Sequence, residues 1–249
     1  MNNKNTNTSK IKHLKDLTTA GMPRIDYTLE DGRKITMRAF AVKELKLLLM
    51  ASAAGNAQDF QVLQVLSQCI DQDIDLELLP AHEVECLYLE LYKLSKGSSI
   101  VPVSYKCTNE IDGQPCGEHF TVNLNLNSVV KFDQTPRQIE LVDGVTLNMR
   151  LPNTREREYF SEDTTRDAFN MAMACIESVE TPSETMVVGI DIEREELAEL
   201  IEYMDTRVFS EIMTWITTLP TLQLHVPVCC PKCRHTEVIA LEGLGDFFD

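Results

Sequence analysis

Cysteines give the clearest chemical signal in this sequence. The C-P-x-C turn from Cys230 to Cys233 directs its backbone amides toward the sulfurs and favours thiolates bound to a metal. Such turns occur in pairs, and the second pair here is Cys107 and Cys116, which an eight-residue spacer separates. Four thiolates bind zinc as a tetrahedral site with Zn–S distances of about 2.3 Å. The sequence therefore predicts one Zn²⁺ held by Cys107, Cys116, Cys230 and Cys233.

All four ligand positions of this site come from the protein. A site without an open position binds neither water nor substrate, so its predicted role is structural rather than catalytic. Three alternatives stay open: unligated buried thiols, a disulfide, or a site in which Cys229, His119 or His235 replaces one cysteine. A reducing compartment disfavours the disulfide. The remaining cysteines fall on apolar helical faces and are expected in cores: Cys69, Cys86 and Cys175.

The sequence lacks the common signatures of enzymes. It contains no G-x-S-x-G, no G-x-x-x-x-G-K-[ST], no H-E-x-x-H and no G-x-G-x-x-G motif. The stretch 71–75 resembles the opening of a calcium loop, but the loop glycine is missing and His82 stands where the final glutamate belongs. No catalytic residue and no small-molecule substrate is predicted.

Charge narrows the range of partners. Against 23 Lys and Arg stand 39 Asp and Glu, a net charge of -16, which repels nucleic acid phosphates and anionic lipids. The apolar runs are also too short to span a membrane, so neither nucleic acid nor membrane is an expected partner. Residues 176–205 carry ten acids and one arginine. Within them Glu195, Glu199 and Glu202 are candidate contacts for a basic partner surface, with a solvated helix face as the alternative.

Hydrophobic periodicity predicts the elements that must position the cysteines. Helices are predicted over residues 42–54, 57–70, 81–94, 163–177, 194–204 and 207–219. Strands are predicted in hairpins over 25–39 and 138–151, and over 100–105, 120–126, 222–228 and 237–241. Because strands and helices are segregated, we expect an α+β fold of antiparallel β-hairpins and a zinc-ribbon-like module packed with several amphipathic helices.

The same pattern divides the chain into four parts. Residues 1–22 have few large apolar side chains and a net charge of +3, so they are expected to form a flexible basic tail. Residues 23–99 form a β-hairpin plus helical region. Residues 100–130 together with 221–249 form the zinc-ribbon-like β module. Residues 131–220 are then an insertion that contains a β-hairpin and helices.

Five segments in a fixed order carry a family resemblance. They are Ile35 to Ala51, the Cys107 to Cys116 turn, Thr217-Thr218-Leu219-Pro220, the Cys230 to Cys233 turn, and the ending Leu241 to Phe248. Together they resemble the baseplate hub and hub-assembly proteins of T-even-type contractile-tailed phages. The similarity runs from about residue 23 to the C-terminus. The chain departs from the family pattern in the long first spacer and in Arg234, which stands where glycine is common.

The resemblance implies a late, non-enzymatic protein that builds the central hub of a tail baseplate. It implies either a hub component or an assembly chaperone, with hub and tape-measure proteins as partners. The expected location is the host cell cytoplasm or the virion baseplate. Leu244, Phe247 and Phe248 form an apolar end that either anchors a partner or folds back onto the core. The competing hypothesis is a cytoplasmic zinc-ribbon adaptor or nucleic-acid-associated module unrelated to phage.

Overall fold

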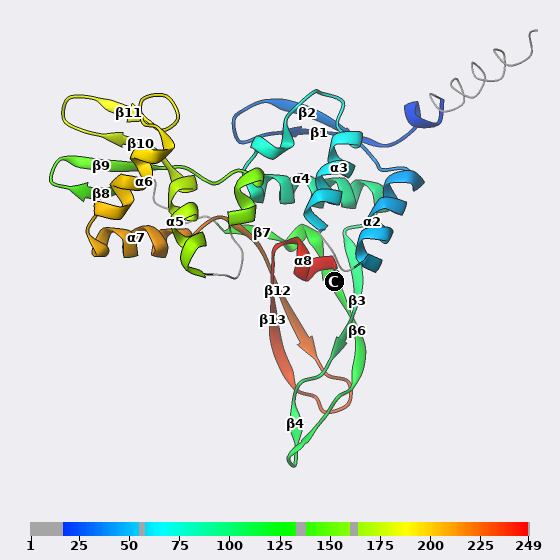
Figure 1. Cartoon of the computed structure of the whole chain (residues 1–249). Coiled ribbons are helices and arrows are strands. Elements are labelled where there is room, and N and C mark those ends of the chain that lie inside the picture. The colour runs from blue at the N-terminus through cyan, green and yellow to red at the C-terminus, as the bar shows by residue number, and fades with distance from the viewer. Residues whose placement is uncertain (1–16, 55–57, 133–137, 160–163, 249) are drawn as a thin grey trace, which may run out of the picture.

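The computed structural model describes residues 17–54, 58–132, 138–159 and 164–248. Figure 1 shows two lobes side by side and a stalk that projects away from them. The strands of each sheet in these residues pair antiparallel, and the helices pack beside the sheets, so the predicted α+β fold is confirmed. None of the described helices combines the length and apolarity that a membrane crossing needs.

The N-terminal lobe is a hairpin covered by helices. Its elements are β1 (Arg24–Thr28), β2 (Lys34–Arg38), α2 (Val42–Ala54), α3 (Gln58–Cys69), the 3₁₀ turn η1 (Leu76–Leu78) and α4 (Ala81–Lys96). The hairpin turns through Gly32 at a φ of +85°, as its Asp-Gly pair predicts. α4 ends at Gly97, whose φ of 63° closes the last turn. The core of the lobe includes the fully buried Met37 and Leu87.

A buried ion pair fixes the start of α2 in this lobe. Arg38 Nη2 donates to Glu44 Oε1 at 2.8 Å, and the side chains are 8 % and 0 % exposed. The other carboxylate oxygen of Glu44 accepts the Ala41 N–H at 2.9 Å, so this side chain also caps the helix. The pair therefore joins β2 to α2 without leaving a buried charge uncompensated.

The second lobe is a four-stranded sheet with helices against it. Its elements are β8 (Gln138–Val142), β9 (Val145–Met149), the 3₁₀ turn η3 (Thr154–Tyr159), α5 (Thr164–Cys175), β10 (Ile176–Glu180), β11 (Thr185–Val187), α6 (Arg194–Tyr203) and α7 (Thr206–Ile216). The strand order is β11-β10-β9-β8. The predicted hairpin turn at Asp143-Gly144 is confirmed. The predicted helix 163–177 is too long, because Ile176 is buried at the start of strand β10, where it pairs with Met149 of β9.

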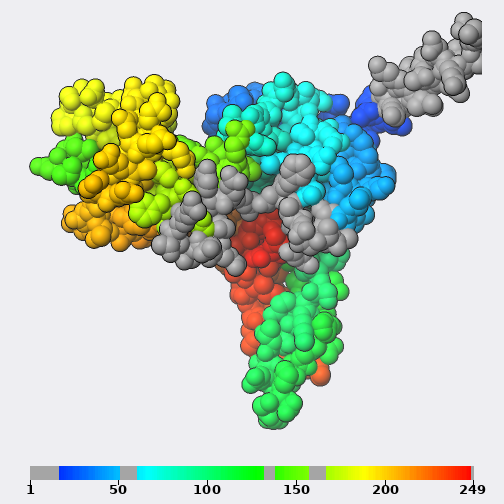
Figure 2. All heavy atoms as spheres, viewed as in Figure 1, coloured from blue at the N-terminus to red at the C-terminus, as the bar shows by residue number. Residues whose placement is uncertain are grey.

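The stalk consists of two hairpins from distant parts of the chain. Its elements are β3 (Ile100–Lys106), β4 (Glu110–Ile111), β5 (Gln114–Pro115), β6 (His119–Asn125), β12 (Thr221–Cys229) and β13 (Thr236–Glu242). At its base lie the 3₁₀ turn η2 (Leu126–Ser128), β7 (Val130–Phe132) and α8 (Gly243–Phe248). Burial alternates along β6 and β12, so each hairpin turns one apolar face toward the other. Figure 2 shows the two segments, green and red-orange, forming one projecting body.

The chain leaves the stalk and returns to it at one place. Thr221 at the start of β12 pairs with Phe132 at the end of β7, so the whole stretch between them begins and ends in neighbouring strands. A second link joins the lobes, where Thr154 donates through its backbone N–H and its hydroxyl to the Leu79 carbonyl, at 2.9 and 3.0 Å. Residues 1–16 of the predicted tail lie outside the described residues, and residues 17–20 are helical.

Candidate metal centre

Four cysteine sulfurs meet at the end of the stalk remote from the lobes. All four Sγ atoms of Cys107, Cys116, Cys230 and Cys233 lie within 4.8 Å of one another. Cys107 Sγ is 3.7 Å from Cys233 Sγ, and Cys116 Sγ is 3.9 Å from Cys230 Sγ. A tetrahedron with metal–sulfur bonds of about 2.3 Å has edges of about 3.8 Å. The sulfurs therefore have the number, chemistry and spacing to hold a tetrahedral metal ion.

The two pairs of cysteines occupy equivalent turns. Cys107 follows β3 and its N–H donates to the Glu118 carbonyl at 2.8 Å, while Cys230 follows β12 and its N–H donates to the His235 carbonyl at 2.9 Å. The residue after the second cysteine is left-handed in both turns, with φ of +61° at Gly117 and 63° at Arg234. An arginine thus occupies a backbone conformation that favours glycine.

The long first spacer folds into a hairpin of its own. β4 pairs with β5, with Glu110 opposite Pro115 and Ile111 opposite Gln114. The Cys116 N–H then donates to the Asn109 carbonyl at 2.7 Å, which closes the hairpin and returns the chain to the metal centre. The extra residues therefore form the tip of the stalk, as Figure 1 shows, and leave the two sulfurs where a short turn would place them.

The geometry of the cluster distinguishes among the alternatives of a disulfide and of a different fourth ligand. All eight cysteines are free thiols, and sulfurs 3.7 Å apart are well beyond the roughly 2.05 Å of a disulfide. Cys229 is exposed on β12, and His119 is exposed on β6. Within the described residues, the group of close donor atoms contains the four cysteines and neither histidine.

The electrostatics of the cluster favour a cation at its centre. The peptide N–H of His235 lowers the pKa of Cys233 to about 6, whereas burial raises the pKa of Cys107 to about 12. Four thiolates at these separations repel one another, so the fully deprotonated set needs a positive charge among the sulfurs.

Neighbouring side chains tie the two turns together, and sequence reasoning missed them. Asn109 Nδ2 lies 3.7 Å from Cys233 Sγ, and Lys232 Nζ lies 3.4 Å from the Cys116 carbonyl oxygen. Farther along the stalk, the Tyr105 hydroxyl donates to Glu237 Oε1 at 2.9 Å. Each contact joins one hairpin to the other. In the sequence, the one sign of these contacts is that Asn109 and Lys232 lie between the cysteines of the two turns.

The family model described as T4 bacteriophage base plate protein matches residues 22–249. The chain belongs to this family. The baseplate hub assembly protein gp26 of Enterobacteria phage T4 is 25 % identical over 215 residues, which are 86 % of this chain and 92 % of that protein. No solved structure matches. The resemblance to T-even baseplate proteins is thereby confirmed.

The C-terminal segment of this base plate protein folds back onto its own core. Phe247 is fully buried, in an apolar cluster with stalk residues such as Leu124 and Leu224. Leu244 is half-buried against the same cluster and against the N-terminal lobe. The side chain of Phe248 lies outside the described residues. Of the two alternatives for this segment, the structure shows the internal one for Phe247.

The acidic candidates lie together on the second lobe of the base plate protein. Glu195, Glu199 and Glu202 are all exposed, and their spacing places them on one face of α6. The opposite face of the helix buries Leu197 and Ile201. The sequence pattern thus predicts the face correctly, although exposure alone assigns no partner to it.

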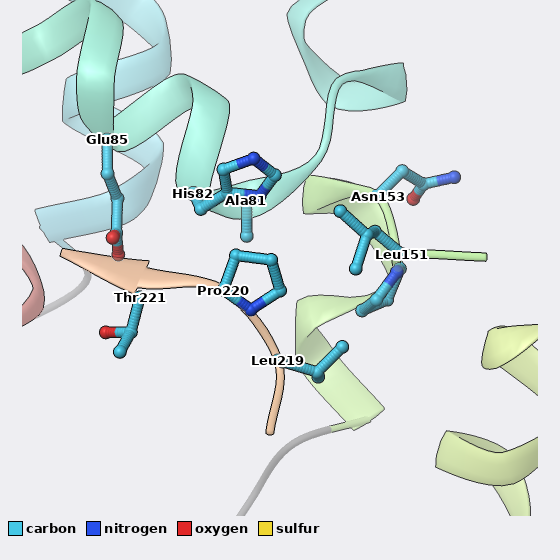
Figure 3. A pocket seen from close by; sticks show the side chains of 9 residues that line it. Ala81, His82, Glu85, Leu151, Asn153, Leu219, Pro220 and Thr221 are labelled. Atoms are coloured by element: carbon cyan, nitrogen blue, oxygen red, sulfur yellow. The ribbon is translucent and has the colours of Figure 1, made fainter. Parts of the chain in front are cut away.

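A small cavity lies where the two lobes meet the stalk (Figure 3). Its volume is about 170 Å³, and it is lined by Ala81, His82, Glu85, Leu151, Pro152, Asn153, Leu219, Pro220 and Thr221. Sites for small molecules usually begin near 300 Å³. The buried His82 is engaged elsewhere, because its Nε2 lies 3.0 Å from Glu30 Oε1. This cavity is a packing junction of three parts and supports no substrate assignment.

Proposed function

We propose that this base plate protein is a non-enzymatic assembly factor of the baseplate hub, which binds hub and tape-measure proteins while the hub is built. The observation that carries the proposal is the match to the base plate family over residues 22–249. The hub assembly protein of phage T4 is matched over 92 % of its length, so the likeness spans both lobes and the stalk. We place the action in the host cell cytoplasm, before the particle is complete.

The proposed role of the cysteine cluster is to hold one structural Zn²⁺. Cys107, Cys116, Cys230 and Cys233 fill all four positions of a tetrahedral ion, so the metal contributes a cross-link and no reactive site. The four-thiol donor set and the sulfur separations support zinc. In this proposal the metal joins the hairpins β3–β6 and β12–β13 and thereby holds the stalk together.

The proposed parts are the tail 1–22, the region 23–99, the zinc-ribbon-like module of 100–130 with 221–249, and the insertion 131–220. Separate apolar clusters in the two lobes and in the stalk support this division. The insertion presents Glu195, Glu199 and Glu202 to solvent, and we propose that this face contacts a basic surface of a baseplate partner.

Affinity capture with the natural partners tests the proposal. The tagged full chain is co-expressed with the hub and tape-measure proteins of its own phage and purified without chelator. We expect elemental analysis to find about one zinc per chain. We also expect at least one of those proteins to be retained. Recovery of the zinc-loaded chain with none of them would refute the assembly role.

Substitution of one cysteine pair tests whether partner binding depends on the metal. The variant with Cys230→Ser and Cys233→Ser is expected to lose both the zinc and the captured protein. Cys229→Ser is the matched control, because Cys229 is adjacent but exposed and outside the cluster. Capture that persists after zinc is lost would overturn the link between stalk and binding, while leaving the assembly role itself intact.

A further inference from the structure

Helix α2 presents an unusual apolar face to solvent. Val42 is 80 % exposed, Leu49 is 63 % exposed and Met50 is 61 % exposed. Val42, the half-buried Leu45 and Leu49 recur at i, i+3 and i+7, so they lie on one face of the helix. Contiguous exposed apolar side chains of this kind are typical of interaction surfaces. We name this set, with Met50, the α2 stripe.

Positive charge lies within and beside the α2 stripe, because Lys46 is four residues from both Val42 and Met50 and so lies between them on the helix surface. Lys43 is 65 % exposed along its side chain, with its Nζ 3.1 Å from Glu44 Oε1, and Lys46 is also exposed. The acidic residue of the same segment, Glu44, is fully buried against Arg38. Along residues 42–50, the charged groups that reach solvent are therefore the two lysines. This surface is basic in a chain whose net charge is -16.

The second lobe contains a groove that also has apolar side chains but carries the opposite charge. A cavity of about 720 Å³ lies between β8 and the junction of α6 and α7. Apolar side chains contribute to its lining, among them Leu141, Leu200 and Met204, and Val142 at its edge is 59 % exposed. We name this cavity the β8–α7 groove.

Acidic side chains surround the β8–α7 groove. Glu140 and Asp143 come from the β8 hairpin, and Asp205 and Glu211 come from α7 and its cap. Arg207 is the one basic residue among those that line it. The groove thus combines apolar lining with a surplus of negative charge, which is the complement of a helix with an apolar stripe and flanking lysines.

The two surfaces cannot meet within one chain. Figure 1 shows α2 at the outer side of the N-terminal lobe, and β8 and α7 at the far side of the second lobe, with both lobes between them. We propose that the α2 stripe of one copy docks in the β8–α7 groove of a second copy. Such a head-to-tail contact leaves one surface free at each end, so it produces a closed ring or an extending chain.

Sedimentation velocity on the full zinc-loaded chain tests this self-association. We expect the average mass to rise with concentration, and the association to weaken by at least about tenfold between about 50 and 500 mM salt, since the contacts are electrostatic in part. Leu49→Glu in the stripe and Val142→Arg in the groove are each expected to weaken it by at least about tenfold. A wild-type chain that stays monomeric at every concentration would overturn the proposal.

Mixing the two variants distinguishes a head-to-tail contact from a symmetric one. Leu49→Glu retains its groove and Val142→Arg retains its stripe, so an equal mixture is expected to form a one-to-one dimer that grows no further. A mixture that remains monomeric would refute the pairing of stripe with groove. Deletion of residues 1–16 is expected to leave the association unchanged. Loss of association on that deletion would assign the groove to the basic N-terminal segment instead.

Matched controls come from exposed apolar positions elsewhere. Leu78→Glu corresponds to Leu49→Glu, because Leu78 is 56 % exposed, and Val238→Arg corresponds to Val142→Arg, because Val238 is 62 % exposed on β13. Both are expected to associate like the wild type. Every variant is compared with the wild type in melting temperature and zinc content, which excludes unfolding as the cause. Equal weakening by the controls would contradict a specific contact.

Discussion

The stalk and the second lobe are both built on antiparallel strands, but they are held together differently. In the second lobe the sheet packs against α5 and α7 around side chains that are fully buried, such as Leu147 and Ile212. In the stalk, burial alternates along β6 and β12, whereas every side chain of β3 and β13 is at least partly exposed. An isolated two-stranded hairpin is marginal in water. Apolar burial between sheet and helices therefore stabilises the lobe, whereas the stalk has a smaller apolar cluster, to which the proposed metal would add a cross-link at the far end.

Breaking the cluster gives the largest expected effect. Cys230→Ser combined with Cys233→Ser leaves two sulfurs, which do not hold a structural zinc. Since metal binding supplies folding free energy in small zinc modules, we expect amide exchange over residues 100–125 and 221–242 to accelerate by at least about 100-fold. Residues 139–159 and 164–216 are expected to keep their protection. Hydrogen exchange measured by mass spectrometry checks both, and an unchanged stalk would contradict the metal-dependent fold.

The N-terminal lobe differs from both regions, because a buried ion pair contributes to its stability. Glu44→Gln leaves the buried Arg38 without its countercharge and is expected to cost about 3–5 kcal/mol of unfolding free energy. Burial raises the pKa of Glu44, but hydrogen bonds from Arg38 and Lys43 outweigh it and hold that pKa below its usual value.

The lowered pKa of Glu44 determines how this cost depends on pH. The stabilisation from ionised Glu44 is present above its unfolded pKa of 4.5 and is lost as the pH falls through its lower folded pKa. The difference between wild type and Glu44→Gln is therefore expected to shrink below about pH 4. Urea unfolding from pH 3 to 7 measures it. A difference that stays constant over this range would exclude the charge as its source.

A substitution that creates a cavity in the second lobe tests whether apolar burial stabilises this lobe. Leu147→Ala removes a fully buried side chain and is expected to lower the unfolding free energy by about 2–5 kcal/mol. The zinc content is expected to stay at the wild-type value, because the cysteine cluster lies in the stalk. Urea unfolding and elemental analysis measure the two quantities. Loss of zinc in this variant would show that the stalk depends on the lobe.

The smallest expected effect is an increase in stability from a substitution in the second cysteine turn. Arg234 has a φ of 63°, so Arg234→Gly removes the strain of a left-handed residue at the cost of a more flexible unfolded chain. The net gain is expected to be about 0.5–1 kcal/mol, measured as a higher melting temperature. The counterpart Gly117→Ala is expected to lose about 1 kcal/mol. A lower melting temperature for Arg234→Gly would show that the arginine side chain itself stabilises the turn.

The elements that were predictable from the sequence are those with local signals. The Asp-Gly pairs at 31–32 and 143–144 mark hairpin turns, and Gly97 marks the end of α4. The cysteine set was also predictable, because the C-P-x-C turn and the period-two strands around it are local patterns. The strand β10 was missed because Cys175 passes directly from helix to strand, without a glycine or proline between them.

Other features depend on contacts between distant residues and leave no local trace. The pairing of β7 with β12 places Phe132 beside Thr221, and the link from Thr154 to the Leu79 carbonyl joins the two lobes. The β8–α7 groove arises from three separate elements. None of these is encoded in the spacing of a single segment, so periodicity cannot reveal them.

The order of the cysteines along the chain has a consequence for protein synthesis. Cys107 and Cys116 emerge from the ribosome before any of the second lobe, and Cys230 and Cys233 emerge after all of it. Domains fold as they emerge, with the N-terminal ones first. The strands and helices of both lobes have therefore been translated before the second pair of thiols arrives. Capture of a metal ion by all four sulfurs thus marks a chain that has been translated through both lobes to its last hairpin.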